Sequence, residues 1–593
     1  MNNKDSCGLK LHKKIELDVL QYLSKNKLFT QRELAERLGY SLGAINQSIN
    51  LLKHLGYIEK TGGLTSLIKE KISNFKPERA VILAAGVGMR MVPVNRTISK
   101  AMLEVHGEVL IERLIKQLHE VGIKEIYIVV GFMKEQFEYL IDKYDVRLLV
   151  NREYDIKNNL VSLFKARKYL KNSYVVPCDL WCEYNPFSHY ELYPWYMIKS
   201  ETDSSSDVLL NRKGELVKIS SEESGNIMVG ISYLDEIAAE FVKSKLEYYS
   251  KKTIYDNCFW EEALYDNSKM ILFGKIDRCN VKEINTYEHL RKIDAKSSQL
   301  DSDAVKLLAE IFHVDKSEIK NIKVLKAGMT NRSFEFVCNE KRYIMRIPGE
   351  GTDQMINRGY EYDVYQAIKD QKICDEIIYI NPNNGYKITG YIENARNCDC
   401  ENMNEVAECM RYLRKFHERK LKVNHEFDIF KQIEFYEGLW KGVSSVYGDY
   451  EETKKNVFSL KKYIDAQNVE KVLTHIDAVP DNFLFTENGI RLIDWEYSGM
   501  QDPHVDIAMF AIYAMYDREQ VEELIDLYFY DGCDLATRKK IYCYIAMSGL
   551  LWSNWCEYKR QFGVEFGEYN LRQYRYAKDY YRLFKQLEDD REN

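Results

Sequence analysis

No stretch of this 593-residue sequence stays apolar for the ~20 residues that a membrane-spanning helix needs. The first residues, Met1 to Lys14, are charged and lack the apolar run of a secretion signal. The 13 cysteines lack the paired C-x-x-C spacing of zinc sites. We therefore expect a cytoplasmic protein with free thiols and no insertion into a membrane.

Internal repeats and low-complexity tracts are also lacking, so domain limits must come from breaks in composition. At 593 residues the chain is too long for one hydrophobic core. Its 45% hydrophobic and 30% charged residues are typical of a folded globular protein. Polar, turn-forming breaks near residues 74–79 and 294–303 predict three domains, over residues 1–75, 77–297 and 298–593.

The first domain is the basic part of the chain. Residues 1–75 hold 12 Lys/Arg against 7 Asp/Glu, whereas the whole chain has a net charge of −7. Thr30 and Ser41 are suited to cap helices over residues 31–38 and 42–55, and a short hairpin follows. This order resembles the winged helix-turn-helix domains of bacterial regulators.

The resemblance implies DNA as a partner of residues 1–75. The side chains that would face bases or phosphates are Asn46, Gln47, Asn50, Lys53 and Lys60. A docking or dimerisation role stays open, because the excess of positive charge is modest. No expected catalytic residue lies in this domain, so its deletion is predicted to spare catalysis.

The second domain opens with a phosphate-binding pattern. The apolar run 80–85 predicts a buried strand, and Gly86 and Gly88 follow it, where backbone amides can approach an anion. Two other nucleotide motifs are lacking. The dinucleotide fingerprint needs a glycine where Met91 stands, and the G-x-x-x-x-G-K-[ST] loop does not occur.

The same segment, L-A-A-G-x-G-x-R ending at Arg90 and followed by Lys100, resembles the signature loop of sugar-phosphate-type nucleotidyltransferases. That family implies a Rossmann-like α/β domain in which a phosphate monoester attacks a nucleoside triphosphate. Arg90 and Lys100 would hold the phosphates as pyrophosphate leaves, and Mg²⁺ would bridge them.

Acidic residues suited to Mg²⁺ follow the predicted strands. Asp179 comes at the carboxyl end of a strand-like run, where ligands gather in α/β sheets, so we expect it to bind the metal. Asp256 is the expected second ligand.

The resemblance narrows to bacterial phosphocholine cytidylyltransferases through the segments 135–137, Asn158-Asn159 and 255–257. It implies CTP as a substrate and contact of Asn158 and Asn159 with substrate, although a turn is the alternative for this pair. Asn285 departs from the family, because many relatives carry an aspartate there. An amide cannot replace that carboxylate's charge.

The third domain carries the most specific motif. His475, Asp477 and Asn482, with Asp494 twelve residues on, resemble the catalytic loop and metal-binding aspartate of aminoglycoside phosphotransferases and choline kinases. The family implies a bilobal protein-kinase-like fold. Asp477 would accept the proton of the substrate hydroxyl, while Asn482 and Asp494 bind Mg²⁺. His475 is expected to brace the loop.

Upstream residues are suited to ATP. Thr330 and Asn331 lie in a turn that would cover the phosphates, and Arg346 offers a cation on the next strand. Glu361, on the following helix, is the expected ion-pair partner of Arg346. Arginine at this position favours the choline branch of the family.

Aromatic residues near the end of the chain indicate which kind of substrate accepts the phosphoryl group. Trp552 and Trp555 have the i, i+3 spacing of one helical face, and Tyr569 follows. Aromatic faces with a nearby carboxylate, here Glu496, suit a quaternary ammonium, which cannot donate conventional hydrogen bonds. The alternative is an aromatic core stripe.

The sequence therefore predicts a multidomain α/β and α+β enzyme acting in two steps. ATP would phosphorylate choline in the third domain, and CTP would convert phosphocholine to CDP-choline and pyrophosphate in the second. Ethanolamine or an aminophosphonate as substrate, and a winged-helix regulator whose transferase domains only sense ligands, are the alternatives. The nucleotide base and a homo-oligomeric state stay open.

Overall fold

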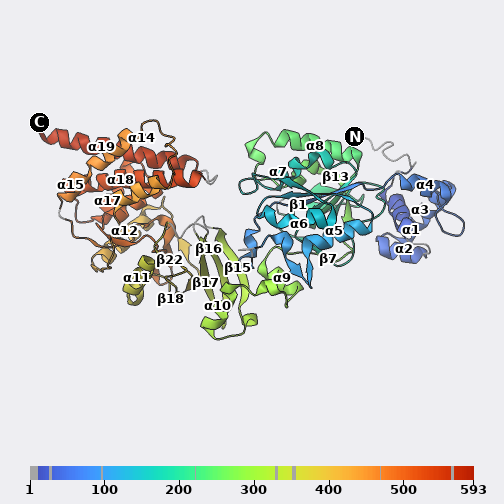
Figure 1. Cartoon of the computed structure of the whole chain (residues 1–593), viewed down its shortest axis with the longest axis horizontal. Helices are drawn as coiled ribbons and strands as arrows, with labels where there is room; N and C mark the ends of the chain where they lie inside the picture. Colours follow the sequence, from blue (N-terminus) through green and yellow to red (C-terminus); the bar gives the residue numbers. More distant parts are fainter. Residues whose placement is uncertain are drawn as a thin grey trace. The chain divides into compact units, whose positions relative to one another are not determined.

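The computed structural model describes residues 11, 13–25, 30–94, 98–220, 222–327, 331–349, 355–467, 469–561 and 566–592. The chain divides into two compact units, Met1–Lys306 and Leu307–Asn593. The first unit holds the winged helix and an α/β domain, and the second is a bilobal kinase-like fold (Figure 1). Among the described residues, no helix is long and apolar enough to cross a membrane.

The winged helix begins the first unit. Its helices are α1 (Lys14–Lys25), α2 (Gln31–Leu38), α3 (Leu42–His54) and α4 (Ser66–Ser73). The expected caps are confirmed, because Thr30 accepts a hydrogen bond from the Glu33 backbone N–H and Ser41 accepts one from Ala44. The expected hairpin is reduced to a single bridge between Ile58 and Leu64.

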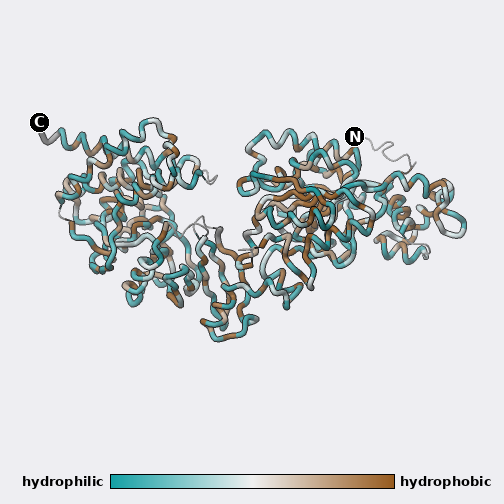
Figure 2. Tube along the Cα trace, viewed as in Figure 1, coloured by the Kyte–Doolittle hydropathy of each residue, from teal (hydrophilic) through white to brown (hydrophobic). Residues whose placement is uncertain are grey.

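The α/β domain is built on a mixed ten-stranded sheet with the order β5-β4-β1-β6-β11-β8-β13-β10-β9, to which β12 is added at β13. The strands are β1 (Arg79–Ala84), β4 (Glu125–Val130), β5 (Arg147–Val150), β6 (Ser173–Pro177), β8 (Trp195–Asp203), β9 (Val208–Leu210), β10 (Glu215–Lys218), β11 (Gly225–Leu234), β12 (Tyr265–Asp266) and β13 (Lys269–Ile276). Strands β5, β4, β1 and β6 are parallel, so the loops after β1 and β6 meet at one edge. Hydrophobic residues concentrate along these strands (Figure 2).

Two hydrophobic cores cover the faces of this sheet, because successive side chains of a strand point to opposite faces. Ala80 and Ile82 of β1 pack in the core that includes α5, whereas Val81 and Leu83 pack in the core with α7 and α8. Figure 1 shows these helices on the two sides of the sheet.

The helices of the α/β domain are α5 (Leu110–Glu120), α6 (Tyr139–Tyr144), α7 (Asn159–Lys165), α8 (Glu236–Tyr249) and α9 (Tyr287–Ile293). Two small ribbons complete the domain, β2 (Glu104–Val105) with β3 (Glu108–Val109), and β7 (Leu180–Cys182) with β14 (Val281–Glu283).

Helix α1 of the winged helix packs against the α/β domain. The carboxylate of Asp18 accepts hydrogen bonds from the hydroxyl groups of Tyr40 and Tyr193. The Gln21 side chain accepts from the Leu192 backbone N–H at 3.2 Å and donates to the Tyr190 carbonyl. One continuous hydrophobic core joins the winged helix to the sheet. The two domains are therefore packed as one body.

This packing changes the expectation for a truncated chain. Deletion of residues 1–75 would expose part of the shared core and leave Tyr193 and the backbone of Leu192 without their partners. Each buried polar group left unpaired costs about 1–3 kcal/mol. We expect the nucleotidyl-transfer activity of the truncated chain to be lost at a lower temperature, with the phosphotransfer activity unaffected. Heating both chains in steps and assaying the two activities tests this; identical inactivation curves would contradict it.

The first lobe of the second unit is a five-stranded antiparallel sheet with the order β15-β16-β17-β19-β18. Helix α10 (Asp303–Phe312) spans the junction of the two units, and α11 follows β17. The elements are β15 (Lys320–Ala327), β16 (Asn331–Cys338), β17 (Lys341–Pro348), α11 (Arg358–Ile368), β18 (Ile377–Ile380) and β19 (Lys387–Gly390). Register pairs Arg346 with Ser333 on one side and Lys387 on the other.

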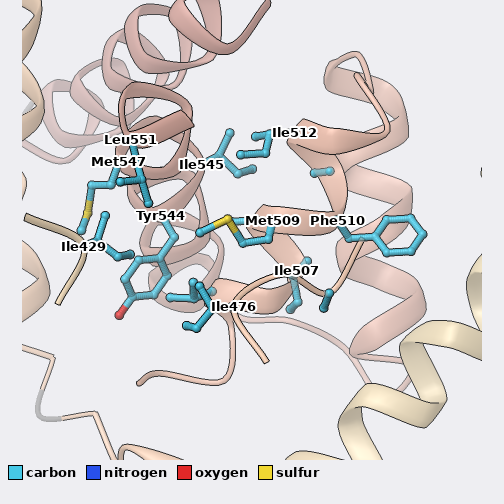
Figure 3. Packing of buried hydrophobic residues seen from close by; sticks show 14 of the residues in the cluster. Ile429, Ile476, Ile507, Met509, Phe510, Ile512, Tyr544, Ile545, Met547 and Leu551 are labelled. Carbon is cyan, nitrogen blue, oxygen red and sulfur yellow. The ribbon is translucent and has the colours of Figure 1, made fainter. Parts of the chain in front are cut away.

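The second lobe is mainly helical and carries two small sheets, β20-β22-β23 and β21-β24. Its helices are α12 (Met403–His417), α13 (Ile429–Gly438), α14 (Tyr450–Ser459), α15 (Lys461–Asp465), α16 (Val505–Tyr513), α17 (Arg518–Tyr528), α18 (Leu535–Arg560) and α19 (Glu568–Glu592). Its strands are β20 (Arg396–Asn397), β21 (Val472–Thr474), β22 (Phe483–Thr486), β23 (Gly489–Leu492) and β24 (Gly499–Gln501). Figure 3 shows side chains of α13, α16 and α18 packed in the core of this lobe.

Candidate active sites

The glycine-rich loop after β1 lies beside Lys100. Gly88 has a left-handed backbone (φ 66°), and a Cβ there would meet the Lys100 side chain at 3.4 Å. The left-handed backbone favours glycine at this position, whereas a Cβ would make only an ordinary contact with Lys100. Gly86 is exposed with open space around it, and Arg90 is exposed on the short helix Met89–Met91. The loop therefore offers an open backbone and an exposed cation to an anion.

Lys100 joins this loop to the expected metal site. Its ammonium lies 2.5 Å from Asp179 Oδ2 and 2.6 Å from Asn285 Oδ1. The two acceptors are neighbours because β14 pairs with β7, and the Ile284 backbone N–H donates to the Asp179 carbonyl. Asn285, which departs from the family pattern, therefore lies next to Asp179, and both side chains bond to the Lys100 ammonium.

The oxygen atoms at this place fit a magnesium ion. Asp179 Oδ1 is buried and has no hydrogen-bond partner among the described residues. An orphaned carboxylate oxygen beside an amide oxygen is the hard donor set that Mg²⁺ prefers. The metal-ligand prediction for Asp179 is thus compatible with the geometry.

The other expected ligand, Asp256, has different neighbours. Its carboxylate lies 3.3 Å from Lys157 Nζ, and its carbonyl accepts from the Asn158 backbone N–H at 2.7 Å. The described contacts therefore place Asn285, rather than Asp256, beside Asp179. Residues 179 and 285 are far apart in sequence, so only strand pairing reveals that they are neighbours.

The Asn158-Asn159 pair holds a turn together, which is the alternative to direct substrate contact. Asn158 caps α7 through the Asn159 backbone N–H, and its amide group donates to the Asn257 carbonyl at 3.0 Å. Asn159 Oδ1 accepts from the Trp260 backbone N–H at 2.8 Å. These side chains tie the start of α7 to residues 257–260, and contact of the pair with substrate stays a prediction.

The kinase motif forms a compact loop in the second lobe. Asn482 Nδ2 donates to the Asp477 carbonyl at 2.9 Å and to its carboxylate at 3.1 Å. Because the amide nitrogen makes both bonds, the Asn482 oxygen that would bind a metal is used in neither. His475 Nε2 lies 3.0 Å from the Ile493 carbonyl, so its bracing role is confirmed. Asp494 is half-exposed, and with Asn482 it presents oxygen ligands that fit Mg²⁺.

Arg346 and Glu361 form the expected ion pair. The guanidinium makes two bonds to the Glu361 carboxylate, at 2.5 and 2.7 Å, and both side chains are buried. Burial alone would raise the pKa of Glu361, but the charges of Arg346 and Lys387 hold that pKa at about 2. The carboxylate is therefore ionised and keeps Arg346 in place.

Glu496 and Arg358 extend this ion pair into a buried network. Glu496 Oε2 lies 3.2 Å from Arg358, 3.5 Å from Arg346 and 3.0 Å from the amide of Asn331. Glu496 is thus already engaged by two guanidinium groups, and its role as the counter-charge of the acceptor stays a prediction. Asn331 is likewise held by side chains rather than left open for phosphate, and Thr330 lies outside the described residues.

The expected acceptor residues Trp552, Trp555 and Tyr569 lie among other aromatic side chains. Trp552 is half-buried and lies edge-on to both Tyr497 and Trp555, with ring centroids 5.7 Å apart in each pair. The ring centroids of Tyr569 and Tyr513 are 6.2 Å apart. Burial first, and the charge of Asp477 among other neighbours, raises the pKa of Tyr497, Tyr513 and Tyr569.

Several of these residues were missed by sequence reasoning. The Tyr513 hydroxyl donates to Asp481 Oδ2 at 2.8 Å. Tyr497 follows Glu496 directly, but nothing in the motif says that its ring faces Trp552. Arg358 precedes Glu361 by three residues on a helix, and that spacing was a readable signal.

The pKa of Asp477 is raised to about 8, first by burial and then by the charges of Asp494 and Glu496. A general base must be deprotonated, and the charged fraction grows as pH rises toward that value. Because a quaternary ammonium acceptor does not titrate, we expect kcat/KM of phosphotransfer to rise with pH and level off above about 8. A flat profile between about pH 6 and 9 would contradict this assignment.

Comparison with known proteins agrees with the three-part order. The MarR family model matches residues 8–63, the MobA-like NTP transferase domain matches 80–183, and choline/ethanolamine kinase matches 322–532. The choline-phosphate cytidylyltransferase of Streptococcus pneumoniae is 30% identical over 231 residues, which cover 36% of this chain and 96% of that protein. The chain belongs to this cytidylyltransferase family.

Two further relatives match the catalytic domains. The 2-aminoethylphosphonate cytidylyltransferase of Lancefieldella rimae is 31% identical over 201 residues, covering 33% of this chain and 82% of that protein. Protein LicA of Haemophilus influenzae is 26% identical over 260 residues, covering 41% of this chain and 95% of that protein. The chain is thus an enzyme that joins a cytidylyltransferase domain to a choline/ethanolamine kinase domain.

Proposed function

We propose that the kinase domain phosphorylates choline with ATP and that the cytidylyltransferase domain joins the phosphocholine to CTP, releasing pyrophosphate. The observation that carries this proposal is the edge-on pair of Trp552 and Tyr497, since the charge of Asp477 acts on the Tyr497 hydroxyl. Aromatic faces suit a quaternary ammonium, whereas a primary ammonium needs hydrogen-bond acceptors. ATP and CTP are intracellular nucleotides, so we place both reactions in the cytoplasm.

In the kinase step, Asp477 accepts the hydroxyl proton while the hydroxyl oxygen attacks the γ-phosphorus of ATP. Asn482 orients the Asp477 carboxylate through the bond at 3.1 Å. We propose that Asn482 and Asp494 hold Mg²⁺ in this domain and that Asp179 holds it in the other. Bound Mg²⁺ neutralises charge on the triphosphate. Arg346 is fixed by Glu361 and would contact the phosphates of ATP.

In the cytidylyltransferase step, little acid-base work is needed, since the phosphate monoester is already a nucleophile. Lys100 lies between the metal-site residues and the glycine-rich loop, and Arg90 is exposed at the end of that loop. Both cations are suited to hold the triphosphate in line with the attacking oxygen.

A product assay tests both steps at once. The purified chain is incubated with ATP, CTP, Mg²⁺ and one acceptor, either choline or ethanolamine, and products are followed by mass spectrometry. A parallel reaction supplies 2-aminoethylphosphonate with CTP alone, because the relative from Lancefieldella rimae is named a 2-aminoethylphosphonate cytidylyltransferase. We expect CDP-choline as the main product. Faster turnover of ethanolamine or of the aminophosphonate would reject choline as the preferred substrate.

Replacement of Trp552 tests the aromatic pocket. We expect Trp552→Ala to raise KM for choline roughly 2- to 30-fold, since a cation–π contact contributes about 0.5–2 kcal/mol, with little change for ATP. Trp552→Phe keeps an aromatic face and is the matched control. Equal increases for choline and ATP would mean that Trp552 is only a core residue.

DNA binding by residues 1–75 is a second candidate function. It is supported by the match to the MarR family and by the exposed side chains of Asn46, Gln47 and Asn50 along α3. Titration of the chain with duplex DNA at two salt concentrations tests it, because phosphate contacts make binding weaken as salt rises. No binding at low salt would leave a docking role for this domain.

A further inference from the structure

Helix α11 of the first lobe contacts the second lobe through two side chains of its first turn. Arg358 lies 3.2 Å from Glu496, within the buried charge network. Tyr360 lies face to face with the imidazole of His425, with ring centroids 4.1 Å apart and ring planes 2° from parallel. His425 precedes α13 of the second lobe. The stacked pair therefore joins two lobes of one compact unit.

The imidazole of His425 is held firmly by the second lobe. Its side chain is buried, and Nε2 lies 2.9 Å from the Ser498 carbonyl. Because a carbonyl only accepts, Nε2 carries a proton and donates it to this bond. The His425 carbonyl in turn accepts from the Met500 backbone N–H at 2.9 Å. Side chain and backbone of His425 thus both attach to the segment around β24.

This segment is connected to both catalytic parts of the kinase motif. Strand β24 pairs with β21, which leads into the catalytic loop, and the Ser498 hydroxyl donates to the His475 carbonyl at 3.0 Å. The stretch that begins with Asp494 runs directly into Ser498. The His425 ring therefore has a defined position relative to Asp477 and Asp494.

On the other side of the stack, Tyr360 is followed directly by Glu361, which fixes Arg346. The Tyr360 side chain is 47% exposed and belongs to none of the hydrophobic cores of the described residues. Its ring is thus used for the contact with His425 rather than for packing inside the first lobe. A shift of Tyr360 would move Glu361 with it, because both lie in one helical turn.

We propose that the stacked pair of Tyr360 and His425 is a positioning contact for ATP. It holds the first turn of α11 against the second lobe, so that Arg346, fixed by Glu361, stays aligned with Asp494. The Arg346 guanidinium lies 3.9 Å from the Asp494 carboxylate, and this distance spans the two lobes. The two rings act through these side chains and do not touch the nucleotide. The inference rests on the kinase activity proposed above.

Tyr360→Ala tests the proposal by removing one ring of the pair. We expect KM for ATP to rise about 2- to 12-fold, which corresponds to the roughly 0.5–1.5 kcal/mol of an aromatic pair, with KM for choline unchanged. Tyr360→Phe keeps the ring face and is expected to behave as the wild type. The cytidylyltransferase activity of the same chain measures how much intact protein is present. Equal increases for ATP and choline would overturn the inference.

A double-mutant cycle tests whether the two rings act together. His425→Ala removes the other ring and its bond to Ser498. We expect the double variant, Tyr360→Ala with His425→Ala, to raise KM for ATP no further than His425→Ala alone, because the stack is already lost. Increases that multiply would show that the two side chains act independently and would overturn the inference.

Tyr343→Ala is the matched control for the loss of a ring contact. The Tyr343 ring stacks on Phe336 with centroids 5.5 Å apart, and both lie on neighbouring strands of the first lobe. We expect a lower melting temperature with KM for ATP unchanged. A rise in KM equal to that of Tyr360→Ala would overturn the inference. A wild-type chain that does not phosphorylate choline would instead reject the proposed function, so the two failures are distinguishable.

Discussion

Asp477→Ala is expected to remove ATP-dependent phosphorylation of choline while conversion of supplied phosphocholine to CDP-choline continues at the wild-type rate. Asp477 is the carboxylate of the kinase motif, and the Asn482 amide donates a hydrogen bond to it at 3.1 Å. Loss of a general base costs about 10²–10⁴-fold in rate. The cytidylyltransferase site lies in the other compact unit of the chain and contains none of these residues.

The measurement compares both half-reactions in one preparation. Asp481→Ala is a suitable control, because Asp481 belongs to the same loop but is exposed and bonded to Tyr513. This control is expected to keep most of the phosphorylation rate. A loss of both half-reactions in Asp477→Ala would reject the assignment of two separate sites.

Asp179→Asn is expected to reduce cytidylyl transfer by about 10²–10³-fold while the kinase step continues, because it removes the carboxylate charge beside Lys100 at the candidate metal site. The substitution keeps the shape of the side chain. Asp256→Asn is the comparison, and we expect a smaller loss because that carboxylate pairs with Lys157. A near-normal rate of CDP-choline formation in Asp179→Asn would mean that the metal site lies elsewhere.

Asn285→Asp refines the same test. The Asn285 side-chain oxygen lies 2.6 Å from Lys100 Nζ, beside Asp179, so the substitution adds a second carboxylate at the candidate metal site. We expect half-maximal cytidylyl transfer at a lower Mg²⁺ concentration. An unchanged Mg²⁺ dependence would show that residue 285 does not take part in binding the metal.

Features that depend on near neighbours in the chain were predictable from the sequence. The helix caps at Thr30 and Ser41 are examples, because each side chain bonds to a backbone N–H only three residues away. The strand that ends in the glycine-rich loop was placed within one residue, at Arg79–Ala84. The ion pair of Arg346 and Glu361 was also found, since it followed from a family motif.

Features that depend on distant segments were not predictable. Glu496 was predicted to supply the negative charge of the acceptor pocket, and its bonds to Arg358 and Asn331 were not foreseen. The Asn158-Asn159 pair was assigned to substrate, yet it bonds to the backbone of residues 257–260. In each case a side chain found a partner about 100 or more residues away, which no local pattern encodes.

The sequence by itself determined the order of the three domains and the classes of the two catalytic domains. The motifs of these domains are short, and the chemistry of phosphate and metal binding restricts which residues occupy them. Only the tertiary structure decided that Asn285 stands beside Asp179 and that α1 shares a core with the α/β domain. Strand pairing and helix packing created these contacts, because buried polar groups must find partners wherever the folded chain brings them.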